Sequence, residues 1–112
     1  MTRPMQSPNP FNEDDHAPLL AARRPQVFVV LPAYNEEANV GRLLERIHES
    51  MEESLFRYRV MVVDDGSIDR TPEILTEYAS RIPLTVSRHN QNQGLGSTIR
   101  DGIYLAAQAA SS

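Results

Sequence analysis

The sequence predicts an α/β fold in which three parallel strands alternate with three helices. Two apolar runs, residues 27–31 and 60–63, are typical of strands that are buried on both faces, as in a parallel sheet. Between and after these runs, apolar residues recur at helical spacing, which gives the order strand, helix, strand, helix, strand, helix. Strands that alternate with helices form right-handed βαβ crossovers, so helices should flank a parallel sheet.

Length and composition limit the possible functions. The chain has 112 residues, which is room for one domain. Its 15 acidic and 11 basic residues give a formal net charge of -4, so no general affinity for nucleic acid is indicated. There is no cysteine, which excludes disulfides and thiolate metal sites. No apolar run approaches membrane-spanning length and the N-terminus lacks the apolar core of a secretory signal, so we expect a cytoplasmic protein.

Residues 1–25 differ in composition from the rest of the chain. They contain repeated prolines, an acidic patch and few large apolar residues. Such a segment cannot bury enough apolar surface to offset its ordering entropy, so we expect a disordered tail. The ordered domain should occupy residues 26–112.

The first strand should begin at Gln26 and stop at Pro32, because proline cannot donate a hydrogen bond to a ladder. Asn35 is a candidate N-cap for the next helix, and Glu36 and Glu37 suit the positive end of a helix. This first helix should run to about residue 53. Its buried stripe is expected to be Val40, Leu43, Leu44, Ile47 and Met51.

The second strand should cover residues 58–63, and Asp69 or Thr71 could cap the helix that follows, with Pro72 in its first turn. The buried stripe of this helix is expected to be Ile74, Leu75, Tyr78, Ala79 and Ile82. A short third strand over residues 84–87 leads to the last helix. The core-facing residues of the last helix are expected to be Ile99, Ile103, Ala106, Ala107 and Ala110.

Each predicted strand is followed by a loop that contains polar residues or glycine. These loops hold residues 34–36, 64–67 and 92–96. In a parallel sheet all three loops lie at one edge, where open α/β sheets bind their ligands. We therefore expect the three loops to converge on one site.

Asp64 and Asp65 directly follow the most apolar strand and precede a Gly-Ser turn. They could act as general acid and base, as metal ligands, or as acceptors for a nucleobase imino N–H or a ribose hydroxyl. Adjacent side chains diverge on an extended backbone, which disfavours a shared metal. The alternative is that Asp65 and Gly66 only form a tight turn after a core strand.

Gly94-Leu95-Gly96 precedes the last helix and resembles a phosphate-cradling turn, because glycines allow close backbone approach and helix-start N–H groups favour anions. It is not a dinucleotide-binding fingerprint, which has a third glycine and follows the first strand. The alternative is that these glycines only form a tight packing turn. Arg100 follows about one helical turn later. It could meet a pyrophosphate or a base, or remain a solvated charge.

Two further side chains have open interpretations. Tyr34 could stack on a base or sugar while Glu36 reaches a hydroxyl, or Tyr34 could be a lid on the sheet edge beside an acid that the helix dipole favours. His89 could be a general base, but no paired acid is evident in the sequence. We therefore expect a surface histidine.

Three motifs in this order resemble a known family. They are VVLPAYNEE at 29–37, VVDDGSIDRT at 62–71, and NQGLG at 92–96 with IRDG at 99–102. Together they resemble the N-terminal, nucleotide-binding half of a family-two glycosyltransferase with the GT-A, Rossmann-like fold. The nearest similarity is to the dolichol- or polyprenyl-phosphate sugar transferases, and it covers roughly residues 26–110.

The resemblance implies an inverting glycosyltransferase. Its donor would be a GDP- or UDP-sugar, and its acceptor a polyprenyl phosphate at the cytoplasmic membrane face. The expected nucleotide-sugar-binding residues are Pro32, Tyr34, Asn35, Glu36, Asp64, Asp65, Gly66, Ser67, Gly94 and Arg100.

The resemblance also distinguishes roles within this set. Pro32, Tyr34 and Glu36 match positions that line the nucleoside pocket of the family. Asp65, rather than Asp64, matches the carboxylate that binds the base. Gly94 and Arg100 match positions near the base and diphosphate.

The family carries an Asp-x-Asp motif after its fourth strand, which holds Mg²⁺ or Mn²⁺ against the diphosphate, and a later acidic base. The sequence ends at Ser112, before either feature. We therefore expect the metal ligands and the base to lie outside this chain, which alone would recognise nucleotide without catalysis. A non-catalytic nucleotide-binding module is one alternative. A receiver-type phosphoacceptor domain is another, but it would need a lysine, and the sequence has none.

Overall fold

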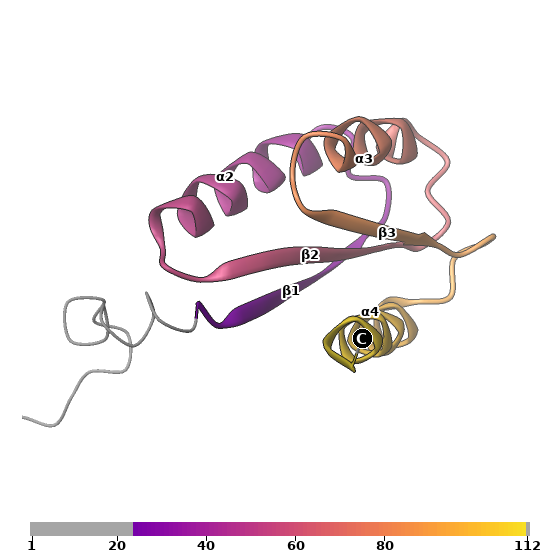
Figure 1. Cartoon of the computed structure of the whole chain (residues 1–112). Coiled ribbons are helices and arrows are strands. Elements are labelled where there is room, and N and C mark those ends of the chain that lie inside the picture. Colours follow the sequence, from indigo (N-terminus) through magenta and orange to yellow (C-terminus); the bar gives the residue numbers. More distant parts are fainter. Residues whose placement is uncertain (1–23, 112) are drawn as a thin grey trace, which may run out of the picture.

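A computed structural model describes residues 24–111 of the chain. The predicted disordered tail lies outside the described residues except for its last two positions, and it stays a prediction. The elements in order are β1 (Gln26–Ala33), α2 (Val40–Glu53), β2 (Arg57–Asp64), α3 (Thr71–Ala79), β3 (Leu84–Arg88) and α4 (Leu95–Ser111) (Figure 1). This confirms the alternating order that the sequence predicts.

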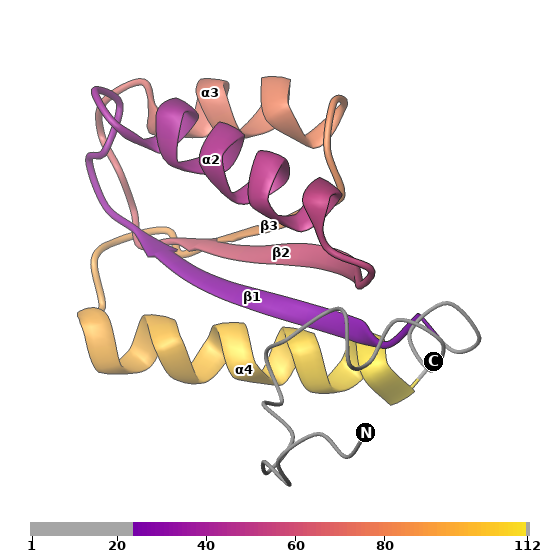
Figure 2. The same ribbon diagram turned by 90° about the vertical axis from the view of Figure 1, so that its left-hand side faces the viewer.

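The strands form one parallel sheet in the order β1-β2-β3. Helices α2 and α3 lie side by side on one face of the sheet, and α4 covers β1 and β2 from the opposite face (Figures 1 and 2). The central strand β2 is therefore enclosed on both faces, and residues 60–64 are almost completely buried. The carboxyl ends of all three strands lie at one edge, as a parallel α/β sheet requires.

The main core lies between the sheet and the helices α2 and α3. Its buried residues include Val40, Leu44, Val60, Val62, Leu75, Tyr78 and Leu84. Two members of the predicted stripes do not join it: Leu43 is exposed at the margin of α2, and Ala79 is exposed where α3 ends. Both expectations were wrong because the buried stripe of each helix is narrower than its apolar sequence pattern.

Strand β1 continues through Pro32 to Ala33, so the predicted stop at Pro32 was wrong. The carbonyl of Ala33 accepts a hydrogen bond from the Asp65 N–H at 2.8 Å. Because successive residues of a strand direct their backbone groups to opposite sides, the missing donor of Pro32 faces away from β2. The proline therefore costs no bond of the β1–β2 ladder, as is typical of edge strands.

The face of α4 that packs on the sheet also differs from the prediction. Its buried residues are Thr98 and Gly102, whereas Ile99 is 39% exposed and Ile103 is 57% exposed. A Cβ atom at Gly102 would lie 2.4 Å from Val30 Cγ1, so the helix approaches β1 at the position that lacks a side chain. Close approach at a glycine, rather than hydrophobicity, determines which face of α4 meets the sheet.

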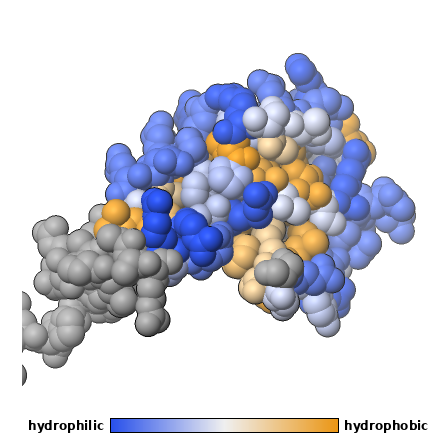
Figure 3. All heavy atoms as spheres, viewed as in Figure 1, coloured by the Kyte–Doolittle hydropathy of each residue, from blue (hydrophilic) through white to orange (hydrophobic). Residues whose placement is uncertain are grey.

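Apolar side chains also remain on the surface of the described part. Leu95, Ile99, Ile103 and Tyr104 of α4 are exposed. In the view of Figure 3, apolar residues gather between α3 and α4, and hydrophilic residues surround them. The described residues thus leave part of their apolar surface uncovered.

Candidate functional site

A cavity of about 320 Å³ lies at the carboxyl edge of the sheet. The loop after β1, the end of β2, the loop after β3 and the first turns of α4 contribute to its wall. The lining residues are Pro32, Ala33, Tyr34, Glu36, Asp65, Asn92, Gly94, Leu95 and Thr98. The convergence of the strand-end loops on one site follows the sequence-based expectation.

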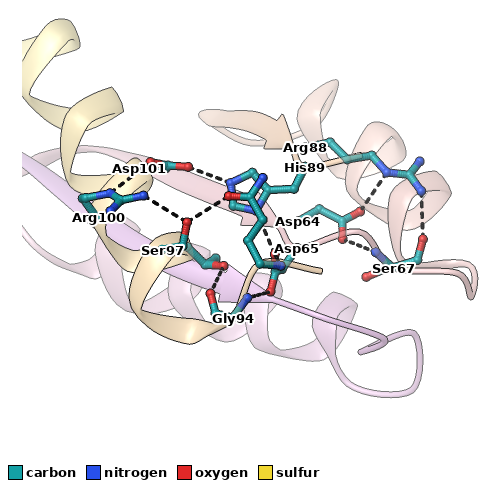
Figure 4. A network of polar contacts seen from close by, with 11 residues as sticks. Asp64, Asp65, Ser67, Arg88, His89, Gly94, Ser97, Arg100 and Asp101 are labelled. Carbon is teal, nitrogen blue, oxygen red and sulfur yellow. Dashed lines mark hydrogen bonds and ion pairs between the residues drawn. The ribbon is translucent and has the colours of Figure 1, made fainter. Parts of the chain in front are cut away.

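The structure divides the expected site residues into two groups. Those that line the cavity are Pro32, Tyr34, Glu36, Asp65 and Gly94. Those that do not line it are Asn35, Asp64, Gly66, Ser67 and Arg100. The adjacent residues Asp64 and Asp65 fall into different groups, and their side chains bind different partners (Figure 4).

Asp64 stabilises the turn that follows β2. Its side chain is 1% exposed, and its Oδ1 accepts a hydrogen bond from the Ser67 N–H at 3.0 Å. Its Oδ2 lies 3.8 Å from Arg88 Nε and has no hydrogen-bond partner among the described residues. Arg88 in turn donates to the Ser67 carbonyl at 2.8 Å. Asp64 and Arg88 therefore fix the backbone at Ser67 from two sides (Figure 4).

Gly66 is required by this turn. Its φ of +76° lies in the left-handed region that favours glycine. An added Cβ would lie 2.6 Å from the backbone carbon of Gln91 and 2.7 Å from the backbone nitrogen of Asn92. The turn after β2 thus packs directly against the loop after β3, which carries one wall of the cavity.

Asn35 and Ser67 join the loops after β1 and β2. The Asn35 N–H donates to Ser67 Oγ at 2.8 Å, and the Ile68 N–H donates to Asn35 Oδ1 at 2.9 Å. Asn35 has a φ of +50°, a conformation that asparagine tolerates better than most residues. Its predicted role as the N-cap of the first helix was wrong, because α2 begins later, with Asn39 at that position.

The same two loops make further contacts a few residues on. The Glu36 N–H donates to Thr71 Oγ1 at 2.8 Å, and the Glu37 N–H donates to Asp69 Oδ2 at 3.1 Å. Asp69 Oδ1 also accepts from the Thr71 N–H at 2.8 Å. The predicted cap at Asp69 or Thr71 was nevertheless wrong, because Arg70 occupies the N-cap position of α3 and no side chain caps it. We name the joined segments 35–37 and 67–71 the loop clamp. Its polar side chains bind backbone groups.

Asp65 turns the other way, toward the loop after β3. Its Oδ1 accepts hydrogen bonds from His89 Nδ1 and from the Gln93 N–H, both at 2.7 Å. Its Oδ2 accepts from the Gly94 N–H at 2.9 Å (Figure 4). The hydrogen bond from His89, followed by those from the two amides, holds the pKa of Asp65 below its ordinary value, against the effect of burial. Asp65 is therefore a fixed carboxylate in the cavity wall.

His89 contradicts the expectation of a surface histidine without an acidic partner. It is 8% exposed, and its Nε2 lies 2.7 Å from Asp101 Oδ2 while its Nδ1 faces Asp65. Hydrogen bonds to two carboxylates require both ring nitrogens to donate, which makes the ring an imidazolium. Asp65 first and Asp101 second raise the pKa of His89. The network links the ends of β2 and β3 to α4.

The sequence did not predict the network of Asp65, His89 and Asp101, because these residues form no local sequence pattern. Asp65 precedes His89 by 24 positions and Asp101 follows it by 12. The three side chains meet because parallel pairing places the ends of β2 and β3 side by side and α4 returns beneath them.

Arg100 lies on the outer side of α4. Its side chain is 65% exposed, its Nη2 donates to Ser97 Oγ at 3.1 Å, and its Nε lies 3.6 Å from Asp101 Oδ1. Together with Ile99 and Ile103, Arg100 lines a second, apolar cavity. It does not line the cavity whose wall contains Asp65. Arg100 reaches the network of His89 through Asp101.

The described residues do not fit a resident divalent cation. Within residues 24–111, no three acidic, histidine or cysteine side chains form a group that could hold a metal ion. Asp64 and Asp65 point apart and bind separate partners. We therefore derive no step through a metal in this part of the chain.

The parallel sheet with helices on both faces and the cavity at its carboxyl edge define a partial α/β domain with a ligand-sized cavity where open parallel sheets bind their ligands. Residues 28–109 match the model of the family described as Glycosyl transferase family 2, and the chain belongs to this family.

Curated relatives share this region. The chain is 37% identical over 91 residues to a dolichyl-phosphate beta-glucosyltransferase of Trichomonas vaginalis. The matched region covers 74% of this chain and 28% of the relative. It is 38% identical over 82 residues to a dolichol-phosphate mannosyltransferase of Pyrococcus furiosus, covering 73% and 23% respectively. The chain thus spans between a fifth and a third of the length of these relatives.

Two solved structures show the same fold. TarS of S. aureus superposes with a TM-score of 0.60 at 28% identity, over 71% of this chain and 23% of that one. The mannosyltransferase PcManGT of Pyrobaculum calidifontis, in complex with GDP-Man and Mn²⁺, superposes with a TM-score of 0.55 at 26% identity, over 72% and 24%. The described residues form part of a GT-A-type glycosyltransferase domain. They include no helix of the length and apolarity needed to cross a membrane.

Proposed function

We propose that this chain supplies the donor-nucleotide site of an inverting glycosyltransferase that transfers a sugar from a nucleotide-diphosphosugar. The observation that carries the proposal is the Asp65 carboxylate. It is held in the wall of a 320 Å³ cavity by His89 and by two backbone amides. A carboxylate fixed in this way offers acceptors to the N–H of a base without first having to be ordered.

The other cavity residues suit a nucleoside. Tyr34 is half-exposed at the cavity and offers an aromatic face to a base or a ribose ring. Glu36 is within the same wall and offers a carboxylate to a ribose hydroxyl. Gly94 brings the backbone close to the ligand. Arg100, one turn into α4, would approach the diphosphate from outside the cavity.

The remaining expected site residues have a different role in this proposal. Asn35, Asp64, Gly66 and Ser67 hold the loops that carry Tyr34, Glu36 and Asp65.

The names of the relatives suggest the reaction of the whole protein. They are dolichyl- and dolichol-phosphate sugar transferases, and one solved neighbour holds GDP-Man and Mn²⁺. We extend this to a polyprenyl phosphate acceptor at the cytoplasmic face of a membrane. Mg²⁺ or Mn²⁺ and the catalytic base would be bound or supplied by residues outside 24–111, so this part alone would bind the donor without transferring the sugar.

A calorimetric titration of the protein with UDP, GDP and their sugars, with and without Mn²⁺, tests the proposal. We expect binding that does not need the metal and that Asp65→Asn weakens by at least about tenfold, because the neutral amide puts an N–H group where an acceptor is needed. Glu49→Gln, which removes one negative charge from the exposed side of α2, is the matched control and should bind like the wild type. A folded protein that binds none of these nucleotides would refute the proposal.

A further inference from the structure

His89 connects two parts of the cavity wall that come from different elements. Its backbone N–H donates to the Asp64 carbonyl at 2.9 Å, which fixes the residue beside the end of β2. Its Nδ1 lies 2.7 Å from Asp65, a residue of the wall, and its Nε2 lies 2.7 Å from Asp101 (Figure 4). Asp101 belongs to α4, whose first turns form another part of the wall. The histidine ring therefore ties α4 to the strand ends.

Two carboxylates face this ring, and the charged groups near them have other partners. Asp65 reaches the ring from the end of β2, and Asp101 reaches it from α4. Arg88, the last residue of β3, directs its guanidinium to the turn after β2. Arg100 lies beside Asp101 on α4, with its Nε 3.6 Å from Asp101 Oδ1. The rest of the loop after β3 carries no charged side chain. Among the described residues, the two carboxylates thus balance the charge of the ring.

The double bridge depends on the positive charge of His89. An imidazolium donates from both nitrogens, whereas a neutral imidazole has one N–H and one lone pair. After loss of the proton, one of the two carboxylates would face that lone pair, which is repulsive. The Asp65 side chain is 5% exposed and that of Asp101 is 37% exposed, so Asp101 can exchange its partner for water at lower cost. The neutral ring therefore keeps Asp65 and releases Asp101.

We infer that His89 is a positioning residue: its positive charge holds α4 against the strand ends, and the cavity binds its ligand tightly only while the ring is protonated. Release of Asp101 would free the α4 part of the wall, where Leu95 and Thr98 line the cavity. A ligand would then have to order this part of the wall as it binds, which lowers its affinity. This inference rests on the proposed function, since it concerns the regulation of the same cavity.

Titration of the protein with UDP and with GDP at several pH values from pH 6 to pH 9 tests the inference. Asp65 first and Asp101 second raise the pKa of His89 from 6.5, so the ring loses its proton as the pH rises through the raised value. We expect the affinity for the nucleotide that binds to fall by about fivefold or more over this range, because a hydrogen bond to a charged group is lost. An affinity that stays constant would overturn the inference and leave the proposed function standing.

Asp101→Asn separates this role of the network from a merely structural one. The asparagine amide can accept a hydrogen bond from a protonated Nε2 and can donate one to an unprotonated Nε2, so the bridge no longer needs the proton. We expect the variant to match the wild type within about twofold at pH 6 and to bind several-fold more tightly at pH 9. Both proteins meet the same nucleotide at each pH, so titration of the ligand cancels from this ratio. A variant that binds more weakly than the wild type at every pH would overturn the inference.

The matched control is His48→Gln, because His48 lies on α2 and bonds to Tyr58 near the opposite end of the sheet. Its affinity should fall with pH as that of the wild type does. A His48→Gln protein whose affinity no longer depends on pH would assign the effect to His48 and overturn the role of His89.

Hydrogen exchange distinguishes failure of this inference from failure of the proposed function. If a folded protein binds neither nucleotide at any pH, the proposed function fails. Exchange of the Thr98 N–H, which donates to the Gly94 carbonyl at 3.1 Å, then decides whether His89 positions α4. The protection of this N–H in Asp101→Asn relative to the wild type should be near unity at pH 6 and should rise at pH 9. A ratio that does not change with pH would refute the positioning role as well.

Discussion

Asp64 and Asp65 are adjacent in sequence but belong to regions that use their polar side chains differently. Asp64 belongs to the loop-clamp side, where side chains from the loops after β1 and β2 bind backbone groups. Asp65 belongs to the cavity side, where a buried carboxylate lines the cavity and accepts the N–H groups of Gln93 and Gly94. Of two adjacent polar residues in one motif, Asp64 therefore stabilises a turn, whereas Asp65 takes part in the nucleotide recognition that we propose. Substitutions on the two sides should therefore separate stability from binding.

The largest effect on stability is expected at Gly66, where the turn after β2 packs against the loop after β3. Gly66→Ala places a Cβ 2.6 Å from the Gln91 backbone at a φ of +76°. Strain and overpacking together should lower the free energy of unfolding by about 3 kcal/mol. Urea unfolding measures this change. Gly96→Ala is the matched control, because nothing lies within 4 Å of an added Cβ there, and it should be neutral or slightly stabilising. Equal urea midpoints for the two variants would contradict the prediction.

Asp64→Ala should have the next largest effect on stability. The substitution leaves the buried Ser67 N–H without its acceptor and removes the acidic partner of Arg88. We expect a loss of about 2 kcal/mol in the free energy of unfolding, typical of a buried polar group left unpaired. Folded protein should still bind UDP, since Asp64 does not line the cavity. A variant as stable as the wild type with no affinity for UDP would reverse the comparison between Asp64 and Asp65.

On the cavity side, the stability that the His89 network supplies should depend on pH. Asp65 and Asp101 raise the pKa of His89 above its ordinary 6.5, so this contribution is complete below pH 6.5 and is lost as the pH rises through the raised value. The pKa of Asp65 is lowered from 3.8, so its contribution is present above pH 3.8 and is lost as the pH falls through the lowered value. The network should thus stabilise most between pH 3.8 and 6.5.

Melting temperatures of the wild type and His89→Gln, measured from pH 5 to pH 9, check this prediction. The wild type should exceed the variant most at the acidic end, and the difference should shrink as His89 loses its proton. A difference that stays constant across this range would show that His89 contributes packing rather than charge.

Apolar runs and helical periodicity were sufficient to predict the alternating order of strands and helices, but not every buried face. Apolar runs identified β1 and β2, and the predicted second strand at 58–63 differs from Arg57–Asp64 by one residue at each end. The buried face of α4 was predicted wrongly, because the pattern placed Ile99 and Ile103 in the core and both are exposed. The decisive contact is the approach of Gly102 to Val30, and a sequence pattern does not reveal which glycine a neighbouring strand will approach.

The site could be predicted less completely than the fold. The parallel order of strands was enough to bring the three loops together. Whether a polar residue in such a loop serves a ligand or the backbone depends on which neighbouring loop it meets. Asn35 and Ser67 meet each other, whereas Asp65 meets the amides of Gln93 and Gly94. His89 was missed because its acidic partners lie on other elements.

The smallest effect on stability is expected at Arg100. Substitution there tests whether the ligand site extends beyond the residues that line the cavity. Its side chain is largely exposed on the outer side of α4, so Arg100→Gln should change the free energy of unfolding by less than about 0.5 kcal/mol. Because it does not line the cavity, the affinity for uridine should not change. If Arg100 reaches the diphosphate, as we propose, the affinity for UDP should fall a few-fold. Titration of both ligands separates the two contributions: an equal loss for uridine and UDP would place Arg100 at the base, and no loss for either would remove it from the site.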